Sequence, residues 1–134
     1  MLVIKRSQRE KMGDPAFVDR TVERLRAYFL EDVYMLEPEE LRFRVKHAIA
    51  KARTYGLTFE SSITTFVLHA ITINPAFDKQ PAIQAALHDP DVEPNGRMTA
   101  MQATVLDSDW GEAALLGDPD VYWAEVHAQQ VKEG

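Results

Sequence analysis

The sequence predicts an all-α fold, a compact bundle of about five to six helices with a short extended N-terminal arm. Apolar residues recur three or four positions apart in several segments, which is the period of one helix face. Proline stands at a favourable first helical position in Asp14-Pro15, Glu37-Pro38 and Gln80-Pro81. Helix-ending residues follow at Gly56 and at Asn74-Pro75. These three observations together favour helices over strands.

The N-terminal arm is residues 1–4, a short β-prone run that cannot be stable alone. We interpret it as a segment packed on the body of the protein, and an edge that pairs with another chain is the alternative. The first helix begins with Asp14 as its N-cap and extends to about residue 31. Its apolar face consists of Val18, Val22, Leu25 and Phe29.

The second helix begins at Glu37-Pro38, where acidic residues complement the positive end of the helix dipole. Gly56 is expected to end it, because glycine readily adopts the left-handed conformation found after helix C-termini. Its apolar face consists of Leu41, Val45, Ala48, Ile49 and Ala52. The rest of this helix is basic, with no acidic residue from position 41 to position 55.

The third segment is predicted to be a helix capped by Thr58, although its Thr, Ile and Val content also permits a strand. No Asp, Glu, Lys or Arg occurs from position 61 to position 77, so we expect this segment at the centre of the core. Its apolar positions are Phe59, Ile63, Phe66, Val67, Ala70 and Ile71.

Shorter elements are expected after Asn74-Pro75. A fourth helix extends from Pro81 to about residue 87, and residues 88–96 are predicted to be a loop. Met98, Met101 and Val105 indicate a fifth helix. Residues 107–111 interrupt the pattern, and a final helical stretch follows Pro119. Trp110, in the expected loop, and Trp123 either fill a core or anchor a partner.

Length and composition bound the kind of protein. The chain has 134 residues, 46% hydrophobic and 27% charged, so we expect residues 1–134 to form one globular domain. The absence of cysteine removes disulfides, thiolate zinc sites and thiol nucleophiles. No apolar run reaches the roughly 18 residues of a membrane span, and the N-terminal residues lack the order of a secretory signal. These features predict a cytoplasmic protein that does not bind a membrane.

Charge is unevenly distributed along the chain. Residues 1–55 hold 12 Lys/Arg and 9 Asp/Glu, whereas residues 56–134 hold 3 Lys/Arg and 12 Asp/Glu. The formal net charge is −6. Such asymmetry is typical of a protein with one basic and one acidic surface. It argues against nucleic acid as the partner, because phosphates would repel the acidic half.

The residues offer no recognisable catalytic, cofactor or metal site. The histidines His47, His69, His88 and His127 do not pair at helical metal-ligand spacing. Asp89, Asp91 and Glu93 alternate as in an EF-hand, but Pro94 stands where that loop needs glycine, so turn formation explains them better. Phosphate-binding glycine loops and G-x-S-x-G elbows do not occur in the sequence.

The basic second helix is the best candidate for a binding surface. A charged run is most often a solvated helix face, yet its like charges repel each other, and of the five bases in this helix only Arg44 has an acidic residue, Glu40, four positions away. They could pair with the acidic half of the same molecule or of a second copy, as in a homo-oligomer, or dock an acidic partner. The predicted partner-binding residues are Arg42, Arg44, Lys46, Lys51 and Arg53.

Several local patterns carry a family resemblance. They are Met1-Leu2-Val3-Ile4 with Ser7-Gln8, Ala52-Arg53-Thr54-Tyr55-Gly56-Leu57, Asn74-Pro75-Ala76-Phe77-Asp78, Ala85-Ala86-Leu87-His88-Asp89-Pro90 and Arg97-Met98. The chain thereby resembles, over about residues 1–106, small helical accessory proteins encoded beside toxins and spike components of the bacterial type VI secretion system. The resemblance implies a cytoplasmic protein that holds a toxin or loads it onto the spike. It brings no site residues with it.

Three hypotheses follow. The first is a non-catalytic adaptor or chaperone that binds a secreted toxin or spike component through the basic helix, the arm and exposed aromatic residues. The second is an immunity protein whose acidic half covers a basic toxin surface. The third is a small enzyme with an unrecognised site, which would require a concave pocket with converging polar groups.

Overall fold

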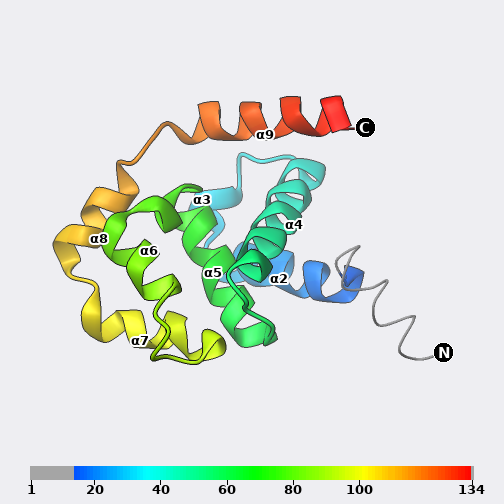
Figure 1. Ribbon diagram of the computed structural model, residues 1–134. Helices are drawn as coiled ribbons and strands as arrows, with labels where there is room; N and C mark the ends of the chain where they lie inside the picture. The colour runs from blue at the N-terminus through cyan, green and yellow to red at the C-terminus, as the bar shows by residue number, and fades with distance from the viewer. Residues whose placement is uncertain (1–13, 134) are drawn as a thin grey trace.

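The computed structural model describes residues 14–133, and these form eight α-helices without a strand (Figure 1). The helices are α2 (Pro15–Tyr28), α3 (Leu30–Val33), α4 (Pro38–Thr54), α5 (Glu60–Thr72), α6 (Pro81–Leu87), α7 (Arg97–Thr104), α8 (Asp107–Ala114) and α9 (Pro119–Glu133), with 3₁₀ turns η1 (Phe77–Lys79) and η2 (Pro94–Gly96). The all-α prediction is confirmed. The predicted arm at residues 1–4 lies outside the described residues.

The described residues contain more helices than the five to six expected, for two local reasons. The predicted first helix is divided at Phe29, whose φ of −134° and ψ of 37° lie outside the helical region. Residues 107–111 were expected to interrupt the helical pattern, yet they form most of α8. Asp107 and Asp109 favour its first turn electrostatically, and the Asp109 carboxylate accepts a hydrogen bond from the Leu106 amide.

The end of α4 confirms the role expected of Gly56. Its φ is +88°, the left-handed conformation that favours glycine. The amide of Leu57 donates to the Ala52 carbonyl and the amide of Gly56 donates to the Arg53 carbonyl, which is the pattern of a Schellman motif. Leu57 and Ala52 are both fully buried, so the motif also directs the chain back into the core.

The start of α5 differs from the expectation that Thr58 caps it. The helix begins at Glu60, so its N-cap residue is Phe59 rather than Thr58. The N-cap side chain makes no capping hydrogen bond. Instead, Oδ1 of Asn95 accepts hydrogen bonds from the amides of Thr58 and Phe59, at 2.9 and 2.8 Å. Asn95 Nδ2 also donates to the Thr58 hydroxyl. A distant loop therefore satisfies the amides that lead into the helix.

The core is built around α5, as its uncharged sequence predicts. Phe66 and Val67 are fully buried, and α5 packs most extensively on α4. Figure 1 shows α5 in the middle of the molecule, between α4 and α6. The helix prediction for this segment is confirmed over the strand alternative, because Ile63, Phe66, Val67 and Ala70 form one inward helical face.

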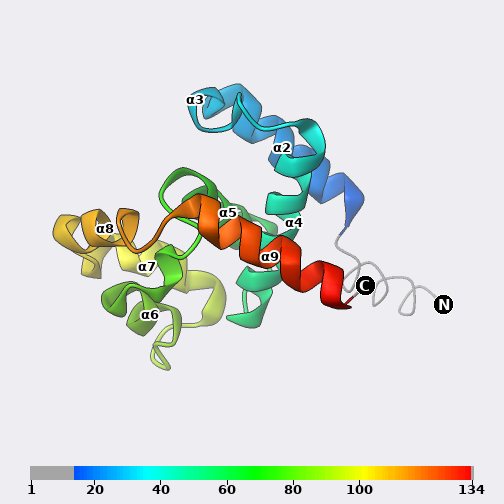
Figure 2. The same cartoon turned by 90° about the horizontal axis from the view of Figure 1, so that it is seen from above.

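Helix α9 crosses over α4 on the outside of the bundle (Figures 1 and 2). Its Trp123 is only 3% exposed but is not part of the main hydrophobic cluster. Trp110, expected in a loop, lies in α8 and packs partly buried against that cluster. Trp110 thus packs at the margin of the core, whereas Trp123 attaches α9 to α4.

Candidate functional site

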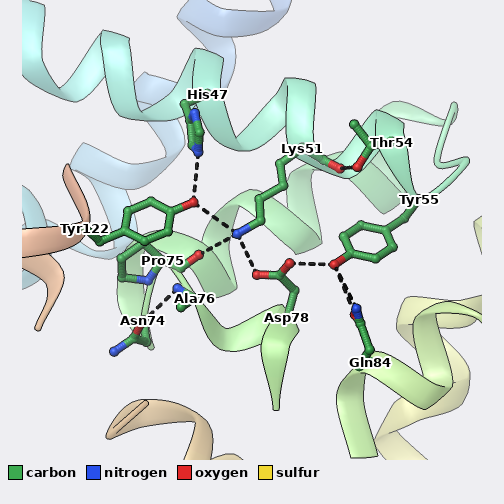
Figure 3. Close-up of polar contacts among 10 residues, drawn as sticks. All are labelled: His47, Lys51, Thr54, Tyr55, Asn74, Pro75, Ala76, Asp78, Gln84 and Tyr122. Carbon is green, nitrogen blue, oxygen red and sulfur yellow. Dashed lines mark hydrogen bonds and ion pairs between the residues drawn. The ribbon is translucent and has the colours of Figure 1, made fainter. Parts of the chain in front are cut away.

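A buried ion pair between α4 and η1 is the most concentrated polar feature of the structure (Figure 3). The Lys51 Nζ lies 2.7 Å from Oδ1 of Asp78. The Asp78 side chain is fully buried, and that of Lys51 is 16% exposed. This ion pair is the one partner found for Oδ1 of Asp78 in the described part of the chain, since that atom accepts no hydrogen bond there.

Tyr55 and Gln84 complete the environment of Asp78. The Tyr55 hydroxyl donates to Oδ2 of Asp78 at 2.6 Å and lies within hydrogen-bonding distance of the Gln84 amide. Burial, followed by the hydrogen bond to Asp78 and the charge of that carboxylate, raises the pKa of Tyr55. The tyrosine therefore remains a hydrogen-bond donor that compensates the buried charge.

Lys51 also connects this cluster to α9. Its Nζ donates to the Pro75 carbonyl and to the Tyr122 hydroxyl, each at 3.0 Å. That hydroxyl lies 2.9 Å from Nε2 of His47. Burial, and then the nearby charge of Lys51, lowers the pKa of His47, and Asp78 opposes this shift. The neutral imidazole is thus favoured beside the lysine.

Chemically, a lysine, a carboxylate and two tyrosines could transfer protons, but here they bind one another. Lys51 and Asp78 are bound to the polar groups named above, and their side chains are 16% and 0% exposed. Two described hollows lie elsewhere: one of about 420 Å³ between α2 and α5, and one of about 350 Å³ beside α6 and α7. We therefore interpret the Lys51–Asp78 cluster as a structural connection between α4, η1 and α9.

A second cluster attaches the rest of α9 to α4. His127 stacks on Phe43 with ring centroids 3.9 Å apart, and its Nε2 lies 2.8 Å from Oε1 of Glu40. The Arg44 guanidinium lies 5.0 Å from the centre of the Trp123 ring and also pairs with Glu40. Burial raises the pKa of Glu40, but the hydrogen bonds from Arg44 and His127 outweigh it, so the pKa is lowered.

The five predicted partner-binding residues do not form one free basic surface. Arg42 pairs with Asp19 of α2, Arg44 with Glu40 and Lys51 with Asp78. Lys46 is exposed and makes no ion pair with another described residue, whereas Arg53 is half-buried. The structure thus assigns several of these charges to contacts within the molecule. Their role in binding a partner stays a prediction.

Exposed apolar side chains gather at one end of the molecule, formed by the last residue of α2, by α3 and by the turn that follows. We define the apolar end by four exposed side chains, whose exposed fractions are 78% for Tyr28, 56% for Leu30, 67% for Tyr34 and 78% for Met35. Isolated exposed apolar residues are common, but four within eight positions are a concentration typical of interaction surfaces. Figure 2 shows α3 at the side of the molecule opposite α6.

The apolar end arises because this segment has more apolar residues than the core can accept. Seven of the nine residues 28–36 are hydrophobic. Val33 is buried, and Phe29 and Leu36 pack partly buried against the core. A helix of four residues cannot turn the others inward as well. The sequence patterns did not predict this surface, although the density of apolar residues in positions 28–36 was a signal for it.

In residues 14–133, no three His, Asp or Glu side chains lie together in a way that could hold a metal ion. In the loop with an EF-hand-like alternation, Asp89 Oδ1 accepts a hydrogen bond from the Asp91 amide, and Glu93 accepts one from the Asn95 amide. These are the turn contacts that the sequence favoured over calcium binding. Among the described helices, none has the length and hydropathy that a membrane span requires.

Comparisons of this chain with models of protein families, with curated proteins and with solved structures identified no match. The site must therefore be interpreted from its own residues.

Proposed function

We propose that this chain is a non-catalytic accessory protein that binds another protein through its apolar end. The observation that carries the proposal is the exposure of Tyr28, Leu30, Tyr34 and Met35 within one short segment. Tyrosine is enriched at the energetic centres of interfaces and methionine in interface cores generally, because these side chains bury a large area. Contact of these apolar side chains with water is unfavourable, so covering them with a partner lowers the free energy.

The partner we propose is a secreted toxin or a spike component, held by this protein in the cytoplasm as an adaptor or chaperone. The support is the resemblance of residues 1–106 to accessory proteins of the type VI secretion system, together with the exposed apolar end. An exposed apolar surface that is already ordered favours this role, because it marks an interaction site and leaves little ordering cost for binding.

An immunity protein is the second candidate, and a separate observation favours it. Residues 98–131 contain no Lys or Arg but include six acidic residues, Asp107, Asp109, Glu112, Asp118, Asp120 and Glu125. All six lie on α8, α9 or the connection between them, and five are exposed. Such an acidic surface suits a basic toxin, for example a nuclease, whose active surface must attract phosphates.

A comparison of partner capture by paired variants tests the binding proposal. The tagged wild-type chain and the variant Tyr34→Ser/Met35→Ser are isolated from native cells, and co-purifying proteins are quantified by mass spectrometry. We expect the variant to lose a stoichiometric partner while its circular dichroism and thermal unfolding stay unchanged, because both side chains are exposed. The control variant is Phe59→Ser, which alters a residue that is 61% exposed, before α5 and outside both proposed binding surfaces.

Equal capture by the wild type and Tyr34→Ser/Met35→Ser would refute the apolar end as the binding surface. Once a toxin is captured, its truncation separates the two candidates. An adaptor binds outside the toxic domain and is needed for secretion. An immunity protein binds the toxic domain itself and restores growth to cells that express it.

A further inference from the structure

The surroundings of the apolar end carry a consistent charge. From position 27 to position 41 the chain has five carboxylates and no Lys or Arg; the carboxylates are Glu31, Asp32, Glu37, Glu39 and Glu40. From Ala27 to Leu41 every charged residue is therefore acidic, and the nearest base is Arg26, two positions before Tyr28. Interfaces tend to pair such a rim with the opposite charge on the partner.

Most of this charge is available to a partner. Glu40 is bound by Arg44 and His127. Glu31, Asp32, Glu37 and Glu39 are exposed and form no ion pair with any other described residue. The nearest bases in sequence, Arg26 and Arg42, lie outside this stretch, and Arg42 is paired with Asp19. Within residues 14–133, no ion pair therefore compensates four of the five carboxylates, which form an acidic rim beside the apolar end.

The segment is held in place by its own backbone and by inward side chains. The amide of Tyr34 donates to the Leu30 carbonyl at 2.8 Å, and the amide of Leu36 donates to the Val33 carbonyl at 3.0 Å. Val33 is 2% exposed and fixes the short helix on the core. Ordering costs on binding are low for such a surface, because little backbone freedom remains to be lost.

From these observations we infer that the apolar end binds a cationic amphipathic segment of another protein, one that presents apolar side chains flanked by Lys or Arg. This inference rests on the proposed function and names the chemistry of its partner. The apolar side chains supply contact area, and the carboxylates select the sign of the flanking charges. Nucleic acid and anionic lipid surfaces do not fit, because both would be repelled by the same carboxylates.

The probes for this inference are three fluorescent helical peptides of about 18 residues, or about five turns. The first places Leu on one face and Lys on the other, the second replaces every Lys by Glu, and the third replaces every Leu by Ser. Binding to the full chain is measured by fluorescence anisotropy at low and high salt. We expect the Leu/Lys peptide alone to bind, more weakly at high salt.

Two triple variants separate a local effect of charge from the net charge of the protein. Glu31→Gln/Asp32→Asn/Glu37→Gln should weaken binding of the Leu/Lys peptide about tenfold, as a few exposed charge pairs together can. Asp91→Asn/Asp120→Asn/Glu125→Gln removes the same charge from exposed positions elsewhere and should change the affinity less than about twofold. Tyr34→Ser/Met35→Ser should abolish binding with all carboxylates present.

Equal binding of the Leu/Glu peptide, or equal weakening by both triple variants, would overturn the inference. Self-association of the full chain that Tyr34→Ser/Met35→Ser abolishes would also overturn it, since the occupant would then be a second copy. If native partner capture depends on Tyr34 and Met35 but not on the three carboxylates, the inference fails while the proposed function stands. If capture depends on neither, the proposed function itself fails.

Discussion

At the scale of single residues, Lys51 shows how a charge that looks superficial in sequence can be buried by the fold. Its side chain is 16% exposed, and its ammonium contacts the Asp78 carboxylate and the Pro75 carbonyl, from one stretch of chain, and the Tyr122 hydroxyl of α9. Buried ion pairs contribute little net stability compared with apolar residues, but removing one partner leaves an uncompensated charge. Lys51 and Asp78 are therefore expected to be sensitive to substitution individually rather than together.

The variant Lys51→Met should lower the free energy of unfolding by about 3–5 kcal/mol, because it leaves Asp78 charged and fully buried. Lys46→Met is the matched control: the same change on the exposed side of the same helix should cost less than about 0.5 kcal/mol. Urea unfolding followed by circular dichroism measures both. The double variant Lys51→Met/Asp78→Asn should recover part of the loss, and no recovery would contradict the explanation from uncompensated charge.

At the scale of elements, the helices begin and end through contacts that differ in range. The stop of α4 at Gly56 is local, because the Schellman motif involves only residues within six positions. The start of α5 is not local, since Asn95 supplies its acceptor from 36 and 37 residues away. Asn95 also accepts a hydrogen bond from the Ser62 hydroxyl through its backbone carbonyl. The turn before α7 thus stabilises the start of α5 through Asn95.

Asn95→Ala should destabilise the protein by about 1–2 kcal/mol, as the loss of a helix cap does, because the amides of Thr58 and Phe59 lose their acceptor. Asn95→Asp retains that acceptor and replaces the Nδ2 donor by an oxygen to which the Thr58 hydroxyl can donate, so its cost should be smaller. Gln102→Ala, at an exposed position of α7, serves as the control. Equal urea midpoints for the wild type and Asn95→Ala would refute this capping role.

At the scale of the whole molecule, α9 is attached to a body that has its own core. Trp123 packs with Phe43, His47 and Arg44 of α4, outside the main hydrophobic cluster. The connection before α9 is held by Asn74, whose side-chain amide donates to the carbonyls of Ala114 and Gly117. Regions with few buried apolar contacts open locally at lower free energy than the core.

Trp123→Ala should therefore release α9 while the body remains folded. Hydrogen exchange with mass spectrometry is expected to show faster exchange in residues 119–133 and unchanged protection in α5. Val131→Ser, at a side chain of α9 that is 78% exposed, is the control and should leave exchange unchanged. Simultaneous loss of protection in α5 would show that α9 and the core unfold as one unit instead.

The sequence by itself determined the features that depend on neighbouring residues. The periods of α2, α4 and α5, the proline starts of α4 and α6, and the stop at Gly56 could all be predicted, because each depends on local geometry. Residues 107–111 were wrongly predicted to interrupt the helical pattern. Asp, Ser and Gly favour turns, so these residues indicated an interruption, whereas Asp107 and Asp109 stabilise the first turn of α8.

Only the tertiary structure decided which polar and apolar side chains face one another or face water. The pairing of Lys51 with Asp78 joins residues 27 positions apart, and no local pattern specifies which base becomes buried. The apolar end was likewise beyond sequence reasoning, because exposure of Tyr34 and Met35 depends on how much surface the core offers to a one-turn helix. Local backbone preference is encoded in a few neighbouring residues, whereas burial is a property of the whole packed chain.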